Sequence, residues 1–190
     1  MLIGARRSLL LLVDLQTRLY AAMAPSSANF LARIALLARA AALLDIPIVV
    51  TRQYPQGLGP LVPELAAALP DTLCPLDKMT FSCCADEAIA SALDAGCDQI
   101  VVAGIETHVC VLQTAFDLHA RDRHVFVLAD ACASRSRDDH DQALARMSHE
   151  GVRVASVESA IFEWLRAATH PRFRDLAREI RNLPRAGSSS

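Results

Sequence analysis

The chain has 190 residues, of which 53% are hydrophobic and 21% charged, and its formal net charge is -2. This length suits one domain of ordinary size with a full hydrophobic core. The near-neutral charge offers no basic field for nucleic acid, and no apolar run approaches the roughly 20 residues that span a bilayer. The composition therefore predicts a soluble globular protein that binds neither nucleic acid nor a membrane.

Two features bear on the cellular compartment. The apolar run after Arg6 and Arg7 is short, ends at Asp14 and lacks a small-residue cleavage site, so it is interpreted as a buried strand. The six cysteines show neither a CxxC pair nor a zinc-finger spacing, in a chain too large to need disulfides. Free thiols in the cytoplasm are expected. Adjacent Cys83 and Cys84 remain a candidate redox pair, although chain neighbours rarely reach disulfide geometry.

The first half of the chain predicts strands that alternate with helices. An apolar run at 8–13 predicts a strand buried on both faces, and an Ala- and Leu-rich segment at 29–44 predicts the helix after it. The β-branched segment 46–51 completes a right-handed parallel crossover. A stretch rich in Pro and Gly at 52–63 predicts an irregular loop at the carboxyl end of that strand, where pockets form. A helical turn at 64–68 and a weak edge strand at 73–76 follow.

The second half continues the alternation. An Ala-rich helix at 85–95 precedes a β-branched strand at 99–103, which leads into a short polar turn. Cys110 then begins a segment whose apolar residues recur at helical spacing. A later polar loop is expected to cap the next helix through Asp138 or Asp139. The remaining strands are expected at 124–128 and 151–154, and the remaining helices at 141–149, 159–168 and 173–181.

About six strands alternating with helices specify an α/β fold. We expect a doubly wound, six-stranded, mostly parallel sheet with helices on both faces, in a Rossmann-like arrangement. Residues 1–183 are expected to form a single domain, and residues 184–190 a disordered C-terminal tail. In such sheets the functional site lies beyond the carboxyl ends of the strands.

Three reactive side chains fall at the carboxyl ends of different strands: Asp14, Lys78 and Cys110. Taken singly, they can be a turn carboxylate, a surface charge and a small core residue. Brought together, the carboxylate can take the thiol proton, while the lysine can lower the pKa of both groups and hold them in position. A helix N-terminus at Cys110 would lower the thiol pKa further. The pattern therefore predicts a nucleophilic cysteine.

Three stretches carry a resemblance to a known family: VDLQ around Asp14, DKMTFSCC around Lys78 and GIETHVCVLQTAFDL around Cys110. From about residue 8 to residue 164, the chain resembles the isochorismatase-like cysteine hydrolases, which include nicotinamidases and N-carbamoylsarcosine amidases. The wording GIETHVCV, with LADACASRS and a late HPRF, is most similar to isochorismatase-domain-containing hydrolases of unassigned substrate. The resemblance implies that Cys110 is the nucleophile, Asp14 the general base, and Lys78 the group that orients and polarises them.

The resemblance also implies a shape for the turn before the nucleophile. A non-proline cis peptide lies there in the family and maps onto Ile105 and Glu106. Its implied purpose is to aim the N–H groups of Glu106 and Cys110 at one point, as an oxyanion hole. The substrate pocket is expected to include Gln16, Tyr54, Phe81 and Thr107, with an exposed loop aromatic as an equally open interpretation of the tyrosine.

No metal or other cofactor is expected. Nicotinamidases carry a metal-binding Asp-x-His stretch after the second strand, where this chain has RQYP at 52–55, and His108 lacks partners at metal spacing. The expected activity is metal-independent hydrolysis of a small amide or related carbonyl compound through a Cys110 thioester. One alternative is a weak or inactive family member that acts as a binding or scaffold protein. The other is a redox sensor that pairs Cys83 or Cys84 with Cys110. The resemblance further implies a homo-oligomer, a dimer or larger.

Overall fold

A computed structural model describes residues 1–24, 29–94 and 96–183 of the chain. Its six strands form one sheet in the order β3-β2-β1-β4-β5-β6, and every neighbouring pair is parallel. The predicted α/β fold is thereby confirmed. The tail predicted at 184–190 lies outside the described residues. The strands are β1 (Ser8–Val13), β2 (Ile48–Gln53), β3 (Leu76–Lys78), β4 (Gln99–Ile105), β5 (His124–Ala133) and β6 (Arg153–Ala155).

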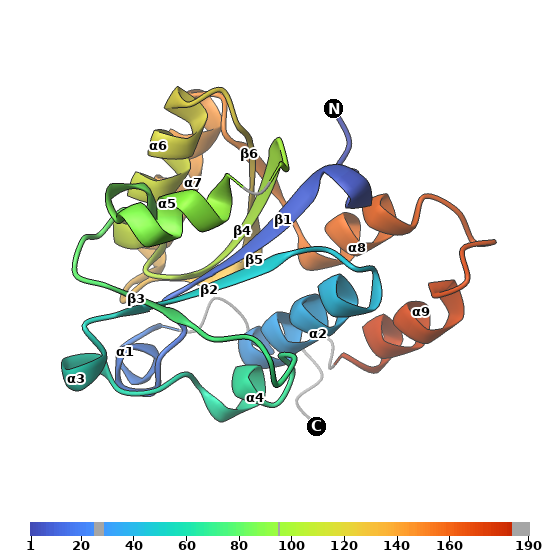
Figure 1. Ribbon diagram of the computed structural model, residues 1–190, viewed down its shortest axis with the longest axis horizontal. Helices are drawn as coiled ribbons and strands as arrows, with labels where there is room; N and C mark the ends of the chain where they lie inside the picture. The colour runs from blue at the N-terminus through green and yellow to red at the C-terminus, as the bar shows by residue number, and fades with distance from the viewer. Residues whose placement is uncertain (25–28, 95, 184–190) are drawn as a thin grey trace.

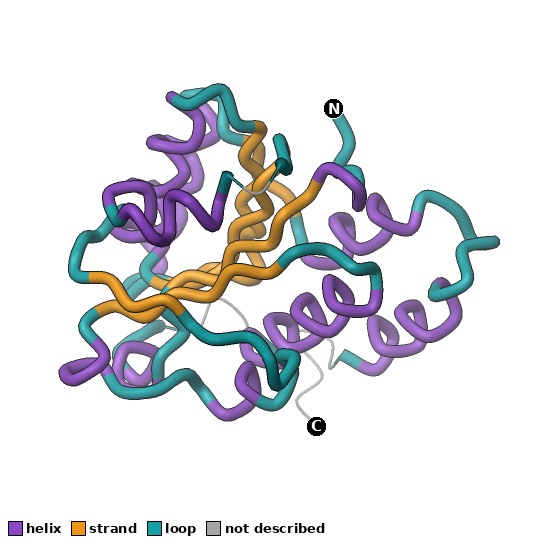
Figure 2. Tube along the Cα trace, viewed as in Figure 1, coloured by secondary structure: helices purple, strands orange, loops and turns teal. Residues whose placement is uncertain are grey.

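Helices cover both faces of the sheet, as Figure 1 shows. One face carries α5 (Glu87–Leu93), α6 (Leu112–Ala120) and α7 (Arg137–His149). The other carries α2 (Phe30–Leu43) and α8 (Val157–Leu165), with α9 (Phe173–Asn182) packed against both of them. The tube view in Figure 2 shows the strands as the layer between these two sets of helices. Shorter elements are η1 (Ala5–Arg7), α1 (Thr17–Ala21), α3 (Pro55–Leu58), α4 (Pro63–Ala66), η2 (Cys83–Ala85) and η3 (Thr107–Val111).

The central strands β1 and β4 are buried along their whole length. Side chains alternate between the faces of a strand, so Leu10 and Leu12 join the core under α2 and α8, while Leu9 and Leu11 join the core under α5, α6 and α7. Burying one such leucine contributes roughly 1.5–3 kcal/mol. The two cores therefore hold β1 from both sides, and the residue that follows it starts from a fixed position.

The structure corrects the prediction around the second and third strands. The strand expected at 46–51 lies at Ile48–Gln53, and the edge strand expected at 73–76 lies at Leu76–Lys78. The loop expected at 52–63 is partly regular, because Pro55 occupies the first turn of α3, where its missing N–H costs no hydrogen bond. These shifts make Lys78 the last residue of a strand that pairs with β2.

The later elements also differ from the prediction at their ends. Strand β5 runs to Ala133, five residues beyond its expected end, and pairs with β4 across a register shift. Helix α7 begins at Arg137, and its N-cap is Ser136, whose hydroxyl accepts a hydrogen bond from the Asp139 N–H at 3.1 Å. The cap expected at Asp138 or Asp139 is therefore wrong by two or three residues, because the Ser136 hydroxyl caps the helix and both aspartates lie within its first turn.

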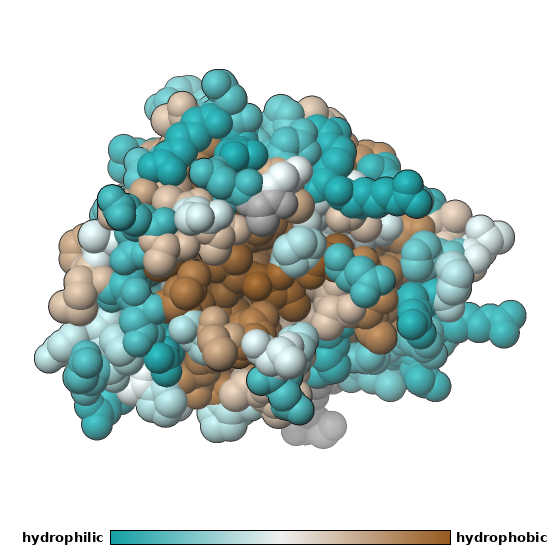
Figure 3. Space-filling view, viewed as in Figure 1, coloured by the Kyte–Doolittle hydropathy of each residue, from teal (hydrophilic) through white to brown (hydrophobic). Residues whose placement is uncertain are grey.

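The face of the molecule seen in Figure 3 has separate polar and apolar regions. Figure 3 shows an apolar region in the middle of this view, around the position of β2 in Figure 1, with hydrophilic residues around it. Exposed large apolar side chains include Tyr54, Met79 and Phe81. No helix within the described residues combines the length and the apolar character that a bilayer crossing needs.

Candidate active site

An ion pair lies at the carboxyl ends of β1 and β3. Asp14 follows β1 directly and Lys78 ends β3. The Lys78 Nζ atom lies 2.6 Å from Asp14 Oδ2, and neither side chain is exposed to solvent. Charges at this depth are stable only when they are paired and hydrogen-bonded. Two of the three residues predicted to converge therefore form a direct contact.

Neighbouring side chains complete the hydrogen bonding of this pair. The Thr51 hydroxyl donates to Asp14 Oδ1 at 2.7 Å, and Lys78 Nζ donates to Gln53 Oε1 at the same distance. Lys78 also donates to the carbonyls of Thr80 and Phe81, at 3.2 Å each. Thr51 and Gln53 were not among the residues expected from the sequence. Their place at the carboxyl end of β2 was the available signal, because the same rule pointed to Asp14.

One glycine allows the two central strands to carry their ends so close together. Gly104 in β4 pairs with Val13 in β1, and its φ is +143°. A Cβ atom there would lie 2.2 Å from the Val13 carbonyl oxygen, a separation no side chain can occupy. Glycine is the residue that accepts this backbone conformation. Gly104 therefore supports the approach that sets Asp14 beside the turn after β4.

Cys110 lies in the π-helical turn η3, Thr107–Val111, between β4 and α6. The helix predicted to carry Cys110 on its first turn starts with this π turn, a local form that is frequent at functional sites, and continues as α6. The Ile105–Glu106 peptide bond immediately before it is cis. Cys110 is 3% exposed, and its thiol and the Asp14 carboxylate form a side-chain hydrogen bond. The three predicted catalytic side chains therefore lie together.

The thiol of Cys110 is a weaker acid than the sequence suggests. Burial and, next, the negative charge of Asp14 raise its pKa to about 12, although the positive charge of Lys78 acts in the opposite direction. The expectation of a lowered pKa is wrong for this state, because desolvation outweighs the lysine. At neutral pH the thiol keeps its proton. A nucleophilic Cys110 therefore needs a base in contact with it.

A second thiol, Cys83, lies near the same charges. It is fully buried, and burial raises its pKa to about 11, while Lys78 acts to lower that pKa. Its backbone N–H donates to the Thr114 hydroxyl at 2.9 Å. All six cysteines of the chain are free thiols in the structure.

A small cavity of about 280 Å³ opens at Cys110. Its walls combine apolar and polar side chains, as is usual for sites that bind small molecules. The apolar lining residues are Leu19, Ala22, Leu58 and Phe81. The polar lining residues are Arg18, Gln53, Glu106 and Arg135.

Of the four residues expected in the substrate pocket, Phe81 lines this cavity. The other three lie outside its lining. Gln16 is buried, and its amide bonds the backbone of Gln53. Tyr54 is 48% exposed. The Thr107 hydroxyl forms a 2.9 Å hydrogen bond with Nδ1 of His140. Leu58 lies in the 52–63 stretch where a pocket was expected, whereas Arg18, Leu19, Ala22 and Arg135 come from segments whose sequence carries no distinct pocket signal.

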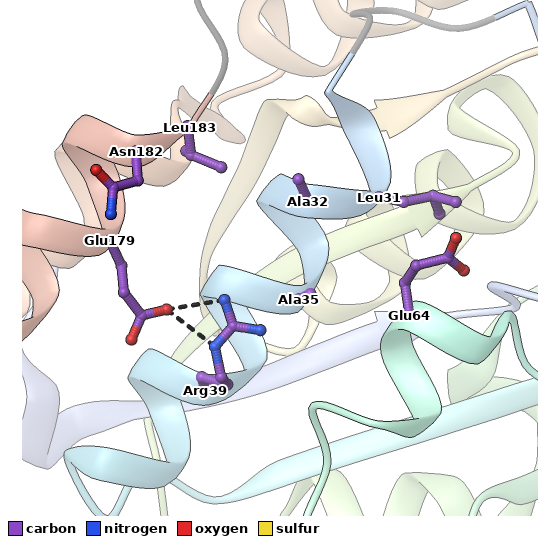
Figure 4. Close-up of a pocket in the computed structure, with 8 residues that line it drawn as sticks. All are labelled: Leu31, Ala32, Ala35, Arg39, Glu64, Glu179, Asn182 and Leu183. Carbon is purple, nitrogen blue, oxygen red and sulfur yellow. Dashed lines mark hydrogen bonds and ion pairs between the residues drawn. The ribbon is translucent and has the colours of Figure 1, made fainter.

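Another hollow, of about 560 Å³, lies between α2, α4 and α9 (Figure 4). Figure 4 shows Arg39 of α2 bonded to Glu179 of α9, with Nε and Nη2 at 2.9 and 2.8 Å from Oε2. None of the described residues that line it carries a thiol, hydroxyl or imidazole group. Across the described parts of the chain, no three His, Cys, Asp or Glu side chains gather as a set of metal ligands. The cavity at Cys110 is thus the better candidate for chemistry.

Comparisons with known proteins agree with this fold. The isochorismatase domain model matches residues 8–159. Mouse isochorismatase domain-containing protein 2A is 40% identical over 185 residues, which cover 95% of this chain and 86% of that protein. A MAR1 ribonuclease structure from Caenorhabditis elegans superimposes with a TM-score of 0.91 at 32% identity, and covers 100% of this chain and 98% of its own.

A further solved structure with the same fold is the YcaC gene product of Escherichia coli, an octameric hydrolase of unknown specificity. It superimposes with a TM-score of 0.84 at 26% identity, and covers 97% of this chain and 98% of its own. The family model accounts for more than half of the chain and contains Asp14, Lys78 and Cys110. This chain belongs to the isochorismatase family of hydrolases.

Proposed function

We propose that the protein is a metal-independent cysteine hydrolase that cleaves a small amide or related carbonyl compound through a Cys110 thioester. The observation that carries this proposal is the contact of a buried Asp14–Lys78 pair with the Cys110 thiol at the edge of a cavity. Nucleophile, base and orienting group are the parts that covalent hydrolysis requires.

The first half of the reaction forms the thioester. Asp14 takes the proton of the Cys110 thiol as the sulfur attacks the substrate carbonyl, and a C–S bond forms while the carbonyl oxygen becomes an oxyanion. The backbone N–H groups of Glu106 and Cys110 are the proposed donors to that oxygen. The tetrahedral intermediate then collapses, the C–N bond breaks, and Asp14 returns the proton to the leaving amine or ammonia.

The second half releases the acid. Asp14, again a carboxylate, takes a proton from water as the water oxygen attacks the thioester carbonyl. The C–S bond then breaks, and the sulfur regains a proton from Asp14. Lys78 stays paired with Asp14 throughout, and its charge stabilises the developing thiolate. Two moderate displacements thereby replace one difficult hydrolysis.

The raised thiol pKa supports a base that acts during attack. A thiol with a pKa of about 12 holds almost no thiolate at neutral pH. Proton transfer to the hydrogen-bonded Asp14 in the same step as attack avoids the formation of a free buried thiolate. A raised Cys110 pKa also fits the alternative function, that of a family member that binds small molecules without turning them over.

Covalent trapping separates these two functions. Purified wild-type protein is incubated with a panel of small amides, ureides and esters, quenched in acid and weighed by intact mass spectrometry. We expect an acyl adduct on the Cys110 peptide and release of the acid product. Cys110→Ala removes both, whereas Cys74→Ala, a change at an exposed thiol, keeps both. Binding of panel members without any adduct or product would favour the scaffold function.

The ribonuclease description of the Caenorhabditis elegans neighbour suggests one further substrate class. This chain has a net charge of -2, whereas proteins that bind nucleic acid usually present a basic field to the phosphates. A cavity of about 280 Å³ also suits a small molecule better than a polymer. We therefore expect no Cys110-dependent cleavage when the protein is incubated with a labelled single-stranded RNA.

We also propose that the protein assembles as a homo-oligomer in a reducing compartment, the cytoplasm. The octameric Escherichia coli neighbour and the exposed Met79 and Phe81 side chains support assembly. Six free thiols, one of them the proposed nucleophile, support the compartment. Light scattering on a size-exclusion column measures the assembly, and a mass near the 20.5 kDa of one chain would contradict it.

A further inference from the structure

The cavity beside Cys110 contains positively charged side chains that take no part in the proposed hydrolysis. Two of its lining residues are arginines, Arg18 and Arg135, and one is an acid, Glu106. The paired Lys78 and Asp14 side chains cancel each other's charge. The described lining therefore keeps one positive charge in excess.

Glu106 holds Arg135 in place but engages only one of its guanidinium nitrogens. The Arg135 Nε atom donates to Glu106 Oε1 at 2.6 Å. The Arg135 side chain is 62% exposed, whereas that of Glu106 is 12% exposed. A guanidinium carries five N–H donors in a planar fork. A contact through Nε leaves the two terminal nitrogens available to a ligand in the cavity.

Arg18 reaches the cavity from α1, on the segment that follows Asp14. Its Nη1 atom donates to the carbonyl of Gly57 at 3.1 Å, which ties the guanidinium to α3. Within the described residues, no carboxylate forms an ion pair with it. Its charge is therefore anchored by a neutral group and remains uncompensated.

We propose that the substrate carries a carboxylate bound by Arg18 and Arg135, in addition to the carbonyl that Cys110 attacks. The inference rests on the proposed function and names its substrate class: the monoamides and ureides of small carboxylic acids. Bidentate pairing with an arginine fork binds a carboxylate through two parallel charge-assisted hydrogen bonds, which add geometric specificity to the charge attraction. One excess positive charge in the lining matches a monoanion.

The size of the cavity limits the substrate further. At roughly 30 Å³ for each water molecule, about 280 Å³ is the volume of about nine waters. A molecule of eight to ten non-hydrogen atoms fills that space. The apolar walls formed by Leu19, Leu58 and Phe81 suit a short methylene chain between the carboxylate and the amide.

Protection of Cys110 against alkylation tests the inference without requiring turnover. Iodoacetamide labelling of the Cys110 peptide is followed at pH 9 in the presence of malonamate, succinamate or glutaramate, and of the corresponding neutral diamides. Each pair differs by one carboxylate against one amide of nearly equal size. We expect at least one acid to protect Cys110 at a tenfold or more lower concentration than its diamide.

The arginines decide the interpretation. Arg18→Gln and Arg135→Gln should each raise the protecting concentration of the acid about tenfold and leave that of the diamide unchanged, and the two lysine variants should restore part of the difference. Glu106→Gln should act in the opposite direction, because it removes the only acid of the described lining. Arg39→Gln, in the hollow between α2 and α9, is the matched control and should change neither value.

Equal protection by acids and diamides, or protection by none of them, would overturn the inference. So would arginine variants that weaken acid and diamide alike, since such variants would have damaged the pocket as a whole. Selective protection without any turnover would contradict the proposed hydrolysis and leave carboxylate binding in place. Turnover of the diamides as fast as the acids would support the proposed hydrolysis and contradict carboxylate binding.

Discussion

Replacing Asp14 with Asn should make Cys110 easier to alkylate while it stops hydrolysis. The Asp14 carboxylate is hydrogen-bonded to the Cys110 thiol, and its negative charge helps to raise the thiol pKa to about 12. At pH 8, that pKa leaves about 1 thiol in 10,000 as thiolate. Asn removes the negative charge and leaves Lys78, which favours the thiolate. The two consequences have opposite signs, and this makes the variant informative.

The size of the effect follows from general pKa behaviour. A charge in direct contact usually changes a pKa by about 1 to 3. The intrinsic reactivity of a thiolate falls with its pKa, with a Brønsted coefficient of about 0.4–0.5, so part of the gain is lost. Alkylation of Cys110 should therefore accelerate by about 3- to 60-fold. Turnover should fall by about 10²- to 10⁴-fold, the usual contribution of a general base.

The assay is iodoacetamide labelling of the Asp14→Asn and wild-type proteins at pH 8, quantified for each cysteine peptide by mass spectrometry. Cys132 is the internal control, because burial raises its pKa to about 12 without any contribution from Asp14. Faster labelling of Cys132 as well would mean that the variant is loosened. Unchanged or slower labelling of Cys110 alone would refute the electrostatic reasoning. Turnover within tenfold of wild type would refute Asp14 as the base.

Three further outcomes follow from the structure. Gly104→Ala should cost at least about 3 kcal/mol of unfolding free energy in urea, because its Cβ would overlap a backbone oxygen, whereas Gly96→Ala, with open space at φ +81°, should cost about 1 to 2 kcal/mol. Thr51→Val removes the 2.7 Å hydrogen bond to Asp14 and should lower kcat about tenfold with KM unchanged, and Thr51→Ser should restore the rate. Burial lowers the pKa of His140 below its ordinary 6.5, so the unfolded chain binds that proton more tightly. Unfolding free energy should therefore fall as the pH drops below 6.5 toward the lower pKa of the folded state, by at most about 1.4 kcal/mol per pH unit, and His140→Gln should flatten that slope.

The positions of the three candidate catalytic residues were largely predictable. Apolar runs such as 8–13 and 99–103 alternate with helical segments, and that alternation specifies a parallel sheet. A parallel sheet brings the carboxyl ends of its strands to one edge. Asp14 and Cys110 follow two such runs, so their approach could be inferred from order along the chain. Lys78 was assigned correctly to that edge even though its strand begins three residues later than expected.

The ends of the elements were less predictable. Strand β5 continues past its apolar run to Ala133, because backbone pairing with β4 continues there after a register shift. Such pairing depends on a partner that is distant in the sequence. The hydrogen-bond partners of Gln16 and Thr107 were equally unpredictable, because they too are distant in the sequence. Gln16 bonds to Gln53 and Thr107 to His140, and neither residue lines the cavity.

By itself, the sequence determined the class of fold, the family and the three side chains that meet at the edge of the sheet. The tertiary structure decided the acidity of Cys110, because burial and two opposing charges act on the thiol and their balance depends on distances. It also decided which side chains line the cavity at Cys110. Arg18 and Arg135 are separated by more than a hundred residues and share one cavity only after the chain has folded.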